Sequence, residues 1–264
     1  MIAPAAWSAL TRLGEAQILL PLMLGVCAWL AREAAGRRAA WMWLLATAGA
    51  AGLTTLSKVA FIGWELGYAP WDYTGVSGHT MFACAILPVV LRVVCHGARP
   101  TLQRSALLAG VLLALAVGVS RYMVGAHSVS EIVLGVALGL PAAGIALRGL
   151  ERSPVQAAAS PPWLLLAVAA WLMTLSAVAP PSRTHDAVTR LSMALSQRAA
   201  PYTRAQMHQA WRRAQHHSNT SAAASKGAAA SLAATSGCTT PAGSGHWMPM
   251  AASSKRMERS QSLA

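Results

Sequence analysis

Long apolar stretches, each with at most one charged residue, most constrain what this chain can fold into. An α-helix of about 20 residues crosses the hydrocarbon core of a bilayer, and the stretches at 39–57 and 129–147 approach that length. Charged residues make up only 11% of the chain, whereas a soluble globular domain carries about 25%. The sequence therefore predicts an integral membrane protein.

We expect six of these stretches to span the membrane as helices, because the alternating pattern of barrel strands is absent. The first stretch is expected to be a retained helix, since no small-x-small cleavage site follows it before Arg32. The expected fold is all-α, a polytopic membrane protein with about six transmembrane helices in a bundle. The expected spans lie at about 16–31, 39–57, 79–96, 105–119, 129–147 and 162–180.

Arginine is concentrated in three short connections, at 32–38, 97–104 and 148–161. Short loops rich in Lys and Arg stay in the cytoplasm, so the alternate connections, 58–78 and 120–128, are predicted to face the other side. With six crossings, both termini lie on that side as well. The arginines that closely follow the last span argue against this placement of the tail, and an error of one helix would reverse it.

The composition changes after Pro181. Residues 182–264 hold ten basic against two acidic side chains and so carry most of the formal net charge of +13. We divide the chain into a six-helix membrane domain, 1–181, and a basic, low-complexity, largely disordered tail, 182–264. Within the tail, 184–199 is expected to form a short surface helix. Disorder is expected from about Ser218, where small residues predominate.

The positive charge does not indicate a nucleic-acid partner. No basic groove interleaved with aromatic residues and no zinc-ligand spacing accompanies it. Outside the tail the excess charge flanks apolar stretches, where orientation and lipid head groups explain it. The four cysteines lack the short paired spacing of metal or redox sites and are interpreted as small buried hydrophobic residues.

Two histidines and two cations gather on the predicted non-cytoplasmic face. His79 and His127 each lie beside the start of a span, while Lys58 and Arg121 each lie at the end of one. Cations beside a glycine at a helix N-terminus, here Gly78, make an anion site, because free amides and the helix dipole favour negative charge. The planar guanidinium of Arg121 suits a phosphate.

The two histidines suggest a division of labour at such a site. One neutral imidazole attacks phosphorus, and the other, protonated, donates to the leaving oxygen. Glu131 lies four residues after His127, so on a helix both share one face and the carboxylate can orient the ring. A metal site is disfavoured, because positive side chains accompany the few carboxylates on this face; no metal and no cofactor is expected.

These residues resemble the signatures of the type 2 phosphatidic acid phosphatase (PAP2) family, within a superfamily that includes bacterial acid phosphatases and vanadium haloperoxidases. Arg121, His127 and Glu131 have the spacing of its third signature. Val-Ser-Gly-His at 76–79 resembles the second, and Lys58 stands where the first begins. The signatures match in order across about 58–131, and the six-span layout agrees over about 16–180.

The resemblance implies a role for each residue. His127 is the nucleophile, His79 is the general acid, and Glu131 orients the nucleophile. The phosphate oxygens would be held by Lys58, Ser77, Gly78 and Arg121. The implied activity is hydrolysis of lipid phosphomonoesters or diphosphates through a phosphohistidine, in a bacterial inner or plasma membrane, with the site on the non-cytoplasmic face. The expected partners are a lipid phosphate and the membrane.

Three positions depart from the family pattern. The third signature normally ends in Asp and here ends in Glu131; the second normally begins with Pro and here begins with Val76. The family's first signature normally has Arg-Pro seven residues after its lysine, and this chain has Glu65 and Leu66 there. The loss of that arginine removes one phosphate contact. Either another donor substitutes, or the substrate is bound differently, or Glu65 points away from the site.

Other interpretations of the same residues stay open. Ser128 to Glu131 fits the S-x-x-E capping box, in which the glutamate bonds a backbone amide only. Lys58 and Arg121 fit interfacial anchors at helix ends. For the whole chain, the alternatives are a non-enzymatic protein on a degenerate phosphatase scaffold and a phosphotransferase that uses the same site.

Overall fold

The computed structural model describes residues 4–152, 162–180 and 182–236, and the regular elements in these ranges are helical. One isolated bridge joins Tyr68 to Tyr73 around a short 3-10 turn, η1 (Ala69–Trp71). The α-helices are α1 (Pro4–Arg12), α2 (Ala16–Leu30), α3 (Ala34–Trp64), α4 (Gly78–Val94), α5 (Pro100–Met123), α6 (Val129–Arg152), α7 (Pro162–Val178), α8 (Thr184–Ser196) and α9 (Arg204–Ser236). The predicted all-α class is confirmed.

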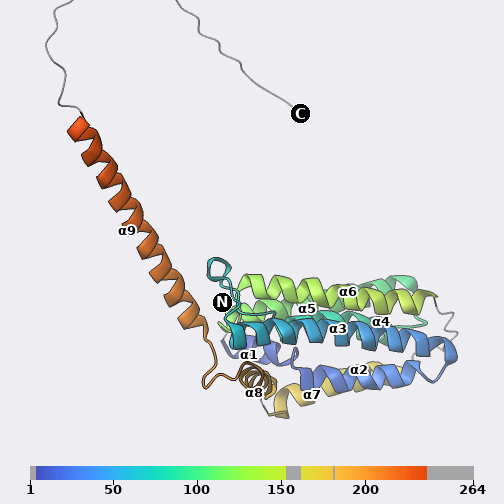
Figure 1. The fold of residues 1–264 in the computed structure, drawn as a ribbon. Helices are drawn as coiled ribbons and strands as arrows, with labels where there is room; N and C mark the ends of the chain where they lie inside the picture. Colours follow the sequence, from blue (N-terminus) through green and yellow to red (C-terminus); the bar gives the residue numbers. More distant parts are fainter. Residues whose placement is uncertain (1–3, 153–161, 181, 237–264) are drawn as a thin grey trace, which may run out of the picture. The chain divides into compact units, whose positions relative to one another are not determined.

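Each of the six predicted spans falls on a helix. Within the described ranges, four helical segments are long and apolar enough to cross a membrane: Ala5–Leu30, Gly36–Trp64, Pro100–Met123 and Val129–Arg152. Two further apolar helices, Gly78–Val94 and Trp163–Val178, are shorter. The chain is therefore a multi-pass integral membrane protein, and α2 to α7 run along one another as a bundle (Figure 1).

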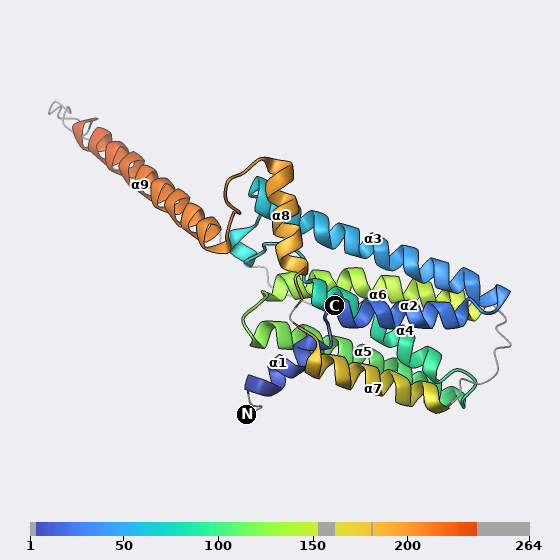
Figure 2. The same ribbon diagram turned by 90° about the horizontal axis from the view of Figure 1, so that it is seen from below.

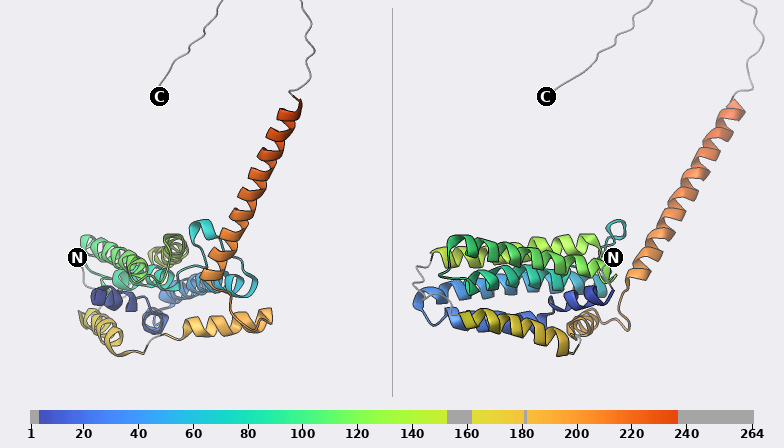
Figure 3. Two further views of the ribbon diagram at one scale, coloured as in Figure 1. Left: turned by 90° about the vertical axis from the view of Figure 1, so that its left-hand side faces the viewer. Right: turned by 180° about the vertical axis from the view of Figure 1, so that it is seen from behind.

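Helix α4 forms the centre of the bundle and contacts α2, α3, α5 and α6. Its residues from Ala83 to Val90 are fully buried, as expected for a helix that is apolar all round. Trp43 of α3 is also fully buried, and its indole nitrogen donates to the Ala85 carbonyl at 2.9 Å. On the outside of the bundle α7 packs against α2 (Figure 3), where the Trp171 indole donates to the Ile18 carbonyl at 3.0 Å.

Small residues let the neighbours of α4 approach its backbone closely. A Cβ added at Gly139 of α6 would lie 2.5 Å from the Met81 carbonyl oxygen, and one at Gly110 of α5 would lie 2.6 Å from the Pro88 Cα. Transmembrane helices gain little from burial of apolar surface against lipid and associate through such close packing. The glycines therefore set the spacing of α4, α5 and α6.

The first compact unit of the chain extends to Arg213, and a second begins at Ala214. Residues 182–213 belong to the first unit because α8 crosses the end of the bundle and packs on α3 (Figure 2). The expected surface helix is present as α8. Residues 218–236, for which we expected disorder, are the second part of α9 in the structure, since this segment is rich in Ala, the strongest helix former. Residues 237–264 lie outside the described ranges.

The close packing of α6 on α4 generates a stability prediction. In Gly139→Ala the new methyl group would meet backbone and Cβ atoms of α4 at 2.5 and 2.6 Å, so the helices must separate. We expect a loss of about 1–3 kcal/mol of stability, the usual cost of overpacking. Gly144→Ala is the matched control on the same helix, because an added Cβ there meets nothing within 4 Å. In detergent, the melting temperature of Gly144→Ala should be higher than that of Gly139→Ala. The reverse order would contradict this account of the packing.

Candidate active site

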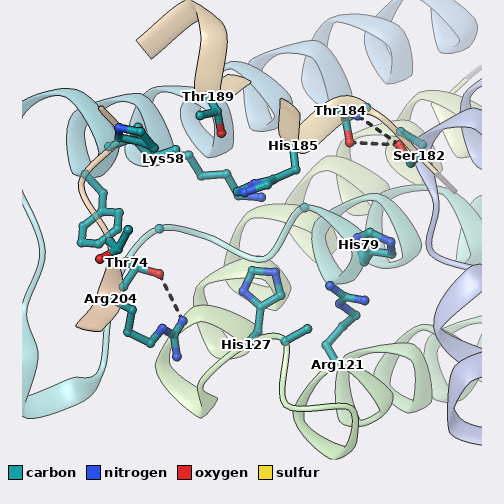
Figure 4. A pocket seen from close by; sticks show the side chains of 18 of the residues that line it. Lys58, Thr74, His79, Arg121, His127, Ser182, Thr184, His185, Thr189 and Arg204 are labelled. Atoms are coloured by element: carbon teal, nitrogen blue, oxygen red, sulfur yellow. Dashed lines mark hydrogen bonds between the residues drawn. The ribbon is translucent and has the colours of Figure 1, made fainter. Parts of the chain in front are cut away.

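The predicted site residues meet at one end of the bundle, around a pocket of about 590 Å³. Lys58 comes from the last turns of α3, His79 from the first turn of α4, Arg121 from the last turn of α5, and His127 from the connection before α6. These four side chains and Gly78 line the pocket (Figure 4). The topology inferred from the apolar stretches therefore brings residues from four segments to one cavity.

His127 and Glu131 form a close pair behind this pocket. The His127 Nδ1 lies 2.6 Å from Glu131 Oε2, and the glutamate side chain is fully buried. Because an ionised carboxylate only accepts hydrogen bonds, Nδ1 carries the proton and Nε2 keeps a free lone pair. Burial lowers the pKa of His127, the hydrogen bond that its ring donates to Glu131 raises the pKa, and the charge of Lys58 lowers it further. The ring is thus held neutral and in a fixed orientation.

Glu131 also caps the start of α6. Its Oε2 accepts the Ser128 amide at 3.2 Å, as in the glutamate half of a capping box. Its Oε1 accepts both the amide and the hydroxyl of Thr74, at 2.8 and 2.5 Å. The capping and orienting interpretations are therefore compatible, because the two carboxylate oxygens serve the helix start, a neighbouring loop and the histidine together.

His79 faces the pocket without a hydrogen-bonding partner in the described part of the chain. It lies on the first turn of α4, whose N-cap residue Ser77 makes no side-chain cap. The turn between α1 and α2 packs directly on it: a Cβ at Gly14 would lie 3.0 Å from the His79 Cβ and 3.1 Å from its carbonyl oxygen. His79 is thus fixed by packing, with its ring available to a ligand.

Lys58 and Arg121 are largely uncommitted cations. The Lys58 amine makes no hydrogen bond or ion pair with the residues described, while Arg121 donates once, to the Thr11 hydroxyl at 3.0 Å. The Arg121 Nε is buried and without a partner among the same residues. Buried donors left unpaired cost free energy, so both groups are suited to an anion. Gly75 (φ 136°) holds the loop against Lys58, since a Cβ there would lie 2.9 Å from the Lys58 Cγ.

Ser77 and Gly78 occupy different positions. Gly78 lines the pocket, but Ser77 is fully buried and is not among the lining residues. The Ser77 hydroxyl accepts from Thr80 Oγ1 at 3.0 Å, and its amide donates to the Glu131 carbonyl at 3.1 Å. In the structure Ser77 therefore joins the start of α4 to the start of α6 behind the site.

Comparison with known families matches residues 14–154 to the PAP2 superfamily. The chain belongs to the PAP2 superfamily. A curated relative from Klebsiella pneumoniae, named "Uncharacterized 22.5 kDa protein in cps region", is 30% identical over 210 residues, which cover 78% of this chain and 99% of the relative. No solved structure matches the chain. The resemblance seen in the signatures is thus confirmed for the family.

Glu65, the main departure from the PAP2 pattern, lies outside the pocket. It ends α3 in a left-handed conformation with φ of 62°. Its carboxylate pairs with Arg198 at 2.7 Å and is about half exposed. Of the three alternatives that its position raised, the structure has Glu65 turned away from the pocket.

Residues beyond the matched PAP2 region complete the pocket wall, and sequence reasoning missed them. His185, Thr189 and Arg204 line it from the segment after the last apolar helix (Figure 4). Arg204 contacts Glu131, Thr74 and Asp72. No spacing pattern marked these residues; the one available signal was the basic character of the tail immediately after the last span.

The described residues contain no group of three or more His, Cys, Asp or Glu side chains arranged to hold a metal ion. The ionisable nitrogen groups that line the pocket are instead three imidazoles, an amine and two guanidinium groups. That donor set is suited to an oxyanion rather than to a cation.

The pair formed by His127 and Glu131 generates a titration prediction. We expect the pKa of His127 to lie below the ordinary value of 6.5, because burial disfavours the charged ring. Lys58→Met removes a positive neighbour and should raise this pKa, whereas Glu131→Gln removes a partner of the imidazolium and should lower it. Nitrogen NMR of histidine-labelled protein in micelles, assigned with His127→Ala, measures both shifts. A wild-type pKa above 6.5, or a fall in Lys58→Met, would contradict this electrostatic account.

Proposed function

We propose that this chain is an integral-membrane phosphatase that hydrolyses phosphomonoesters or diphosphates of lipids through a phosphohistidine on His127. The observation that carries the proposal is the 2.6 Å contact between His127 Nδ1 and the buried Glu131 carboxylate. It leaves Nε2 free at a pocket that two uncommitted cations and a second histidine also line. Membership of the PAP2 superfamily, which implies a phosphatase-like fold, supports the proposal.

In the first step the His127 Nε2 lone pair attacks phosphorus, and the bond between phosphorus and the ester oxygen breaks. His79, protonated once the phosphate anion occupies the pocket and offsets the charges of Lys58 and Arg121, gives its proton to the leaving alkoxide, so the lipid alcohol departs neutral. Lys58, Arg121 and the amides at the start of α4 stabilise the charge that develops on the phosphoryl oxygens. Glu131 stabilises the positive charge that the attacking imidazole acquires.

In the second step water attacks the phosphohistidine. His79, now neutral, accepts a proton from the water as the phosphorus–nitrogen bond breaks. The electron pair of that bond returns to His127 Nε2, and inorganic phosphate leaves. Both histidines regain their starting protonation states, and the mechanism requires no metal.

Two features favour an amphiphilic substrate. The pocket lies at the end of a bundle of membrane-length helices, and the apolar side chains of Phe61, Ile62 and Phe82 line it together with the polar groups. A lipid phosphate presents the same combination of an anionic head and an apolar body. We propose that the head enters from the non-cytoplasmic leaflet, on the side opposite the arginine-rich loops.

His127→Ala should abolish phosphate release, because it removes the imidazole that Glu131 holds in position at the pocket. His79→Ala should lower kcat by about 10²- to 10⁴-fold, the usual contribution of a general acid. His96→Ala is the matched control, since His96 lies at the other end of α4 and does not line the pocket. Phosphate release from a panel of lipid phosphates, measured with purified protein in EDTA, checks these values. Equal activity in wild type and His127→Ala would favour a non-enzymatic protein on a phosphatase scaffold.

The same phosphohistidine would also serve a phosphotransferase. The two activities differ only in whether water or an alcohol attacks the intermediate. Addition of a candidate alcohol to the assay, with analysis for a phosphorylated product, separates them. Phosphate release that is unaffected by the alcohol supports the hydrolase.

Glu131→Gln separates the orienting role from capping. Glutamine keeps an oxygen that can accept the Ser128 amide but lacks the charge that stabilises an imidazolium. We expect kcat to fall by about 10²-fold or more, with the helix content unchanged by circular dichroism. Turnover at the wild-type level would remove Glu131 from the mechanism and leave it as a cap alone.

A further inference from the structure

Arg204, the first residue of α9, contacts several residues at the pocket end of the bundle. No sequence pattern indicated these contacts. Its Nη1 donates to Asp72 Oδ2 at 2.6 Å. Its Nη2 lies 2.8 and 2.9 Å from the two Glu131 oxygens and 3.1 Å from the Thr74 hydroxyl. The guanidinium therefore joins the loop before α4 to the carboxylate that holds His127.

The segment 184–208, which we call the C-terminal strap, is built to place this arginine. α8 packs closely on α3 at Gly63, where an added Cβ would lie 3.1 Å from the Ser196 Cβ. Further along, the Tyr202 amide donates to the Ile62 carbonyl at 3.1 Å, and the rings of Tyr202 and Phe61 lie 5.4 Å apart. The strap is thus fixed to the end of α3 both by α8 and by the connection between α8 and α9.

The start of α9 sets the position of Arg204 within the strap. Thr203 and Gln206 form a reciprocal capping box: the Thr203 amide donates to Gln206 Oε1 at 2.8 Å, and the Gln206 amide approaches Thr203 Oγ1 at 3.4 Å. One turn further on, His208 Nε2 lies 2.7 Å from Asp72 Oδ1, and Met207 is buried beside Phe61 and Ile62. Arg204 is therefore anchored on both sides.

The contacts of Arg204 determine what it can do. Both terminal nitrogens are already engaged by Asp72, Thr74 and Glu131, whereas Lys58 and Arg121 have donors to spare. Arg204 thus acts on the reaction through Glu131 rather than as a principal phosphate ligand. It also balances the charge of a fully buried carboxylate whose other partners among the described residues, His127, Thr74 and Ser128, are uncharged.

We propose that the C-terminal strap is part of the active site and that Arg204 is a positioning residue for the pair formed by Glu131 and His127. The inference rests on the proposed phosphatase function. It adds a residue outside the matched PAP2 region, which ends at 154. Without Arg204, Glu131 loses its cationic partner and the Thr74 loop loses a link to the strap, so the imidazole is held less firmly for attack.

The first test compares Arg204→Ala with wild type in the full chain. We expect kcat to fall by about 10²-fold, the usual cost of a misplaced reacting group, with KM nearly unchanged. Free guanidinium at millimolar concentration should restore part of the rate, which a purely structural role would not show. Arg198→Ala is the matched control: it removes the exposed pair with Glu65 from the same strap, and its rate should stay near wild type and not respond to guanidinium.

A pH profile adds a second readout. His127 is faced by Glu131, Lys58, Arg121 and His79. When Arg204 is removed, the carboxylate interacts more strongly with the imidazolium, so the acidic limb of kcat/KM should move to higher pH. In a Glu131→Gln background this movement should disappear, and Arg204→Ala should cost little further rate. If the two substitutions lower the rate independently of each other in the double variant, the inference is overturned.

The outcomes separate the inference from the function on which it rests. Activity in wild type that His127→Ala does not abolish overturns the proposed function itself. Activity that depends on His127 but is equal in Arg204→Ala overturns only the role of Arg204. A rise in rate in Arg204→Ala would also overturn it and would make the strap inhibitory.

If Arg204→Ala does not fold, Arg204→Lys keeps the charge without the planar guanidinium and should show a smaller fall in kcat. An unchanged kcat in Arg204→Lys would overturn the geometric part of the proposal.

Discussion

The buried carboxylate of Glu131 is the group on which the organisation of the active-site end depends. A carboxylate removed from water costs several kcal/mol unless donors surround it. Here the donors come from separate parts of the chain: Thr74 lies 57 residues before Glu131, Arg204 lies 73 residues after it, and His127 is one helical turn away. The hydrogen bonds to this one carboxylate therefore fix three segments of the chain relative to one another.

The helical bundle supplies the frame that makes such a site possible. α4 is buried on all sides, and the small residues of α6 let the two backbones approach to the point where a Cβ at Gly135 would lie 2.9 Å from the Ser77 carbonyl oxygen. The Ser77 amide donates to the Glu131 carbonyl, so the first turns of α4 and α6 are joined. Because His79 and His127 lie at these two helix starts, the packing of the bundle also brings the two imidazoles to one pocket.

The sequence predicted the parts of the site that depend on local spacing and on topology. The four-residue interval between His127 and Glu131 determines their contact, and the alternation of spans brings Lys58, His79 and Arg121 to one end of the bundle. Ser77 was expected as a phosphate ligand, yet it lies behind the pocket, because a residue at a helix start can face either the cavity or the neighbouring helix. Arg204 was not predicted, since its position depends on how α8 crosses the bundle, and no local pattern encodes that.

The distribution of cations follows from the charges that already surround them. Arg198 and Arg204 of the strap are paired with Glu65, Asp72 and Glu131, and these pairs attach the strap to the bundle. Lys58 and Arg121 have no carboxylate partner at hydrogen-bonding distance among the described residues, so their charge remains available to a ligand. An arginine at position 65 would have added a further cation at the end of α3. With Glu65 there instead, the end of α3 carries an exposed ion pair with Arg198 of the strap, while the second arginine of the strap, Arg204, pairs with the buried Glu131.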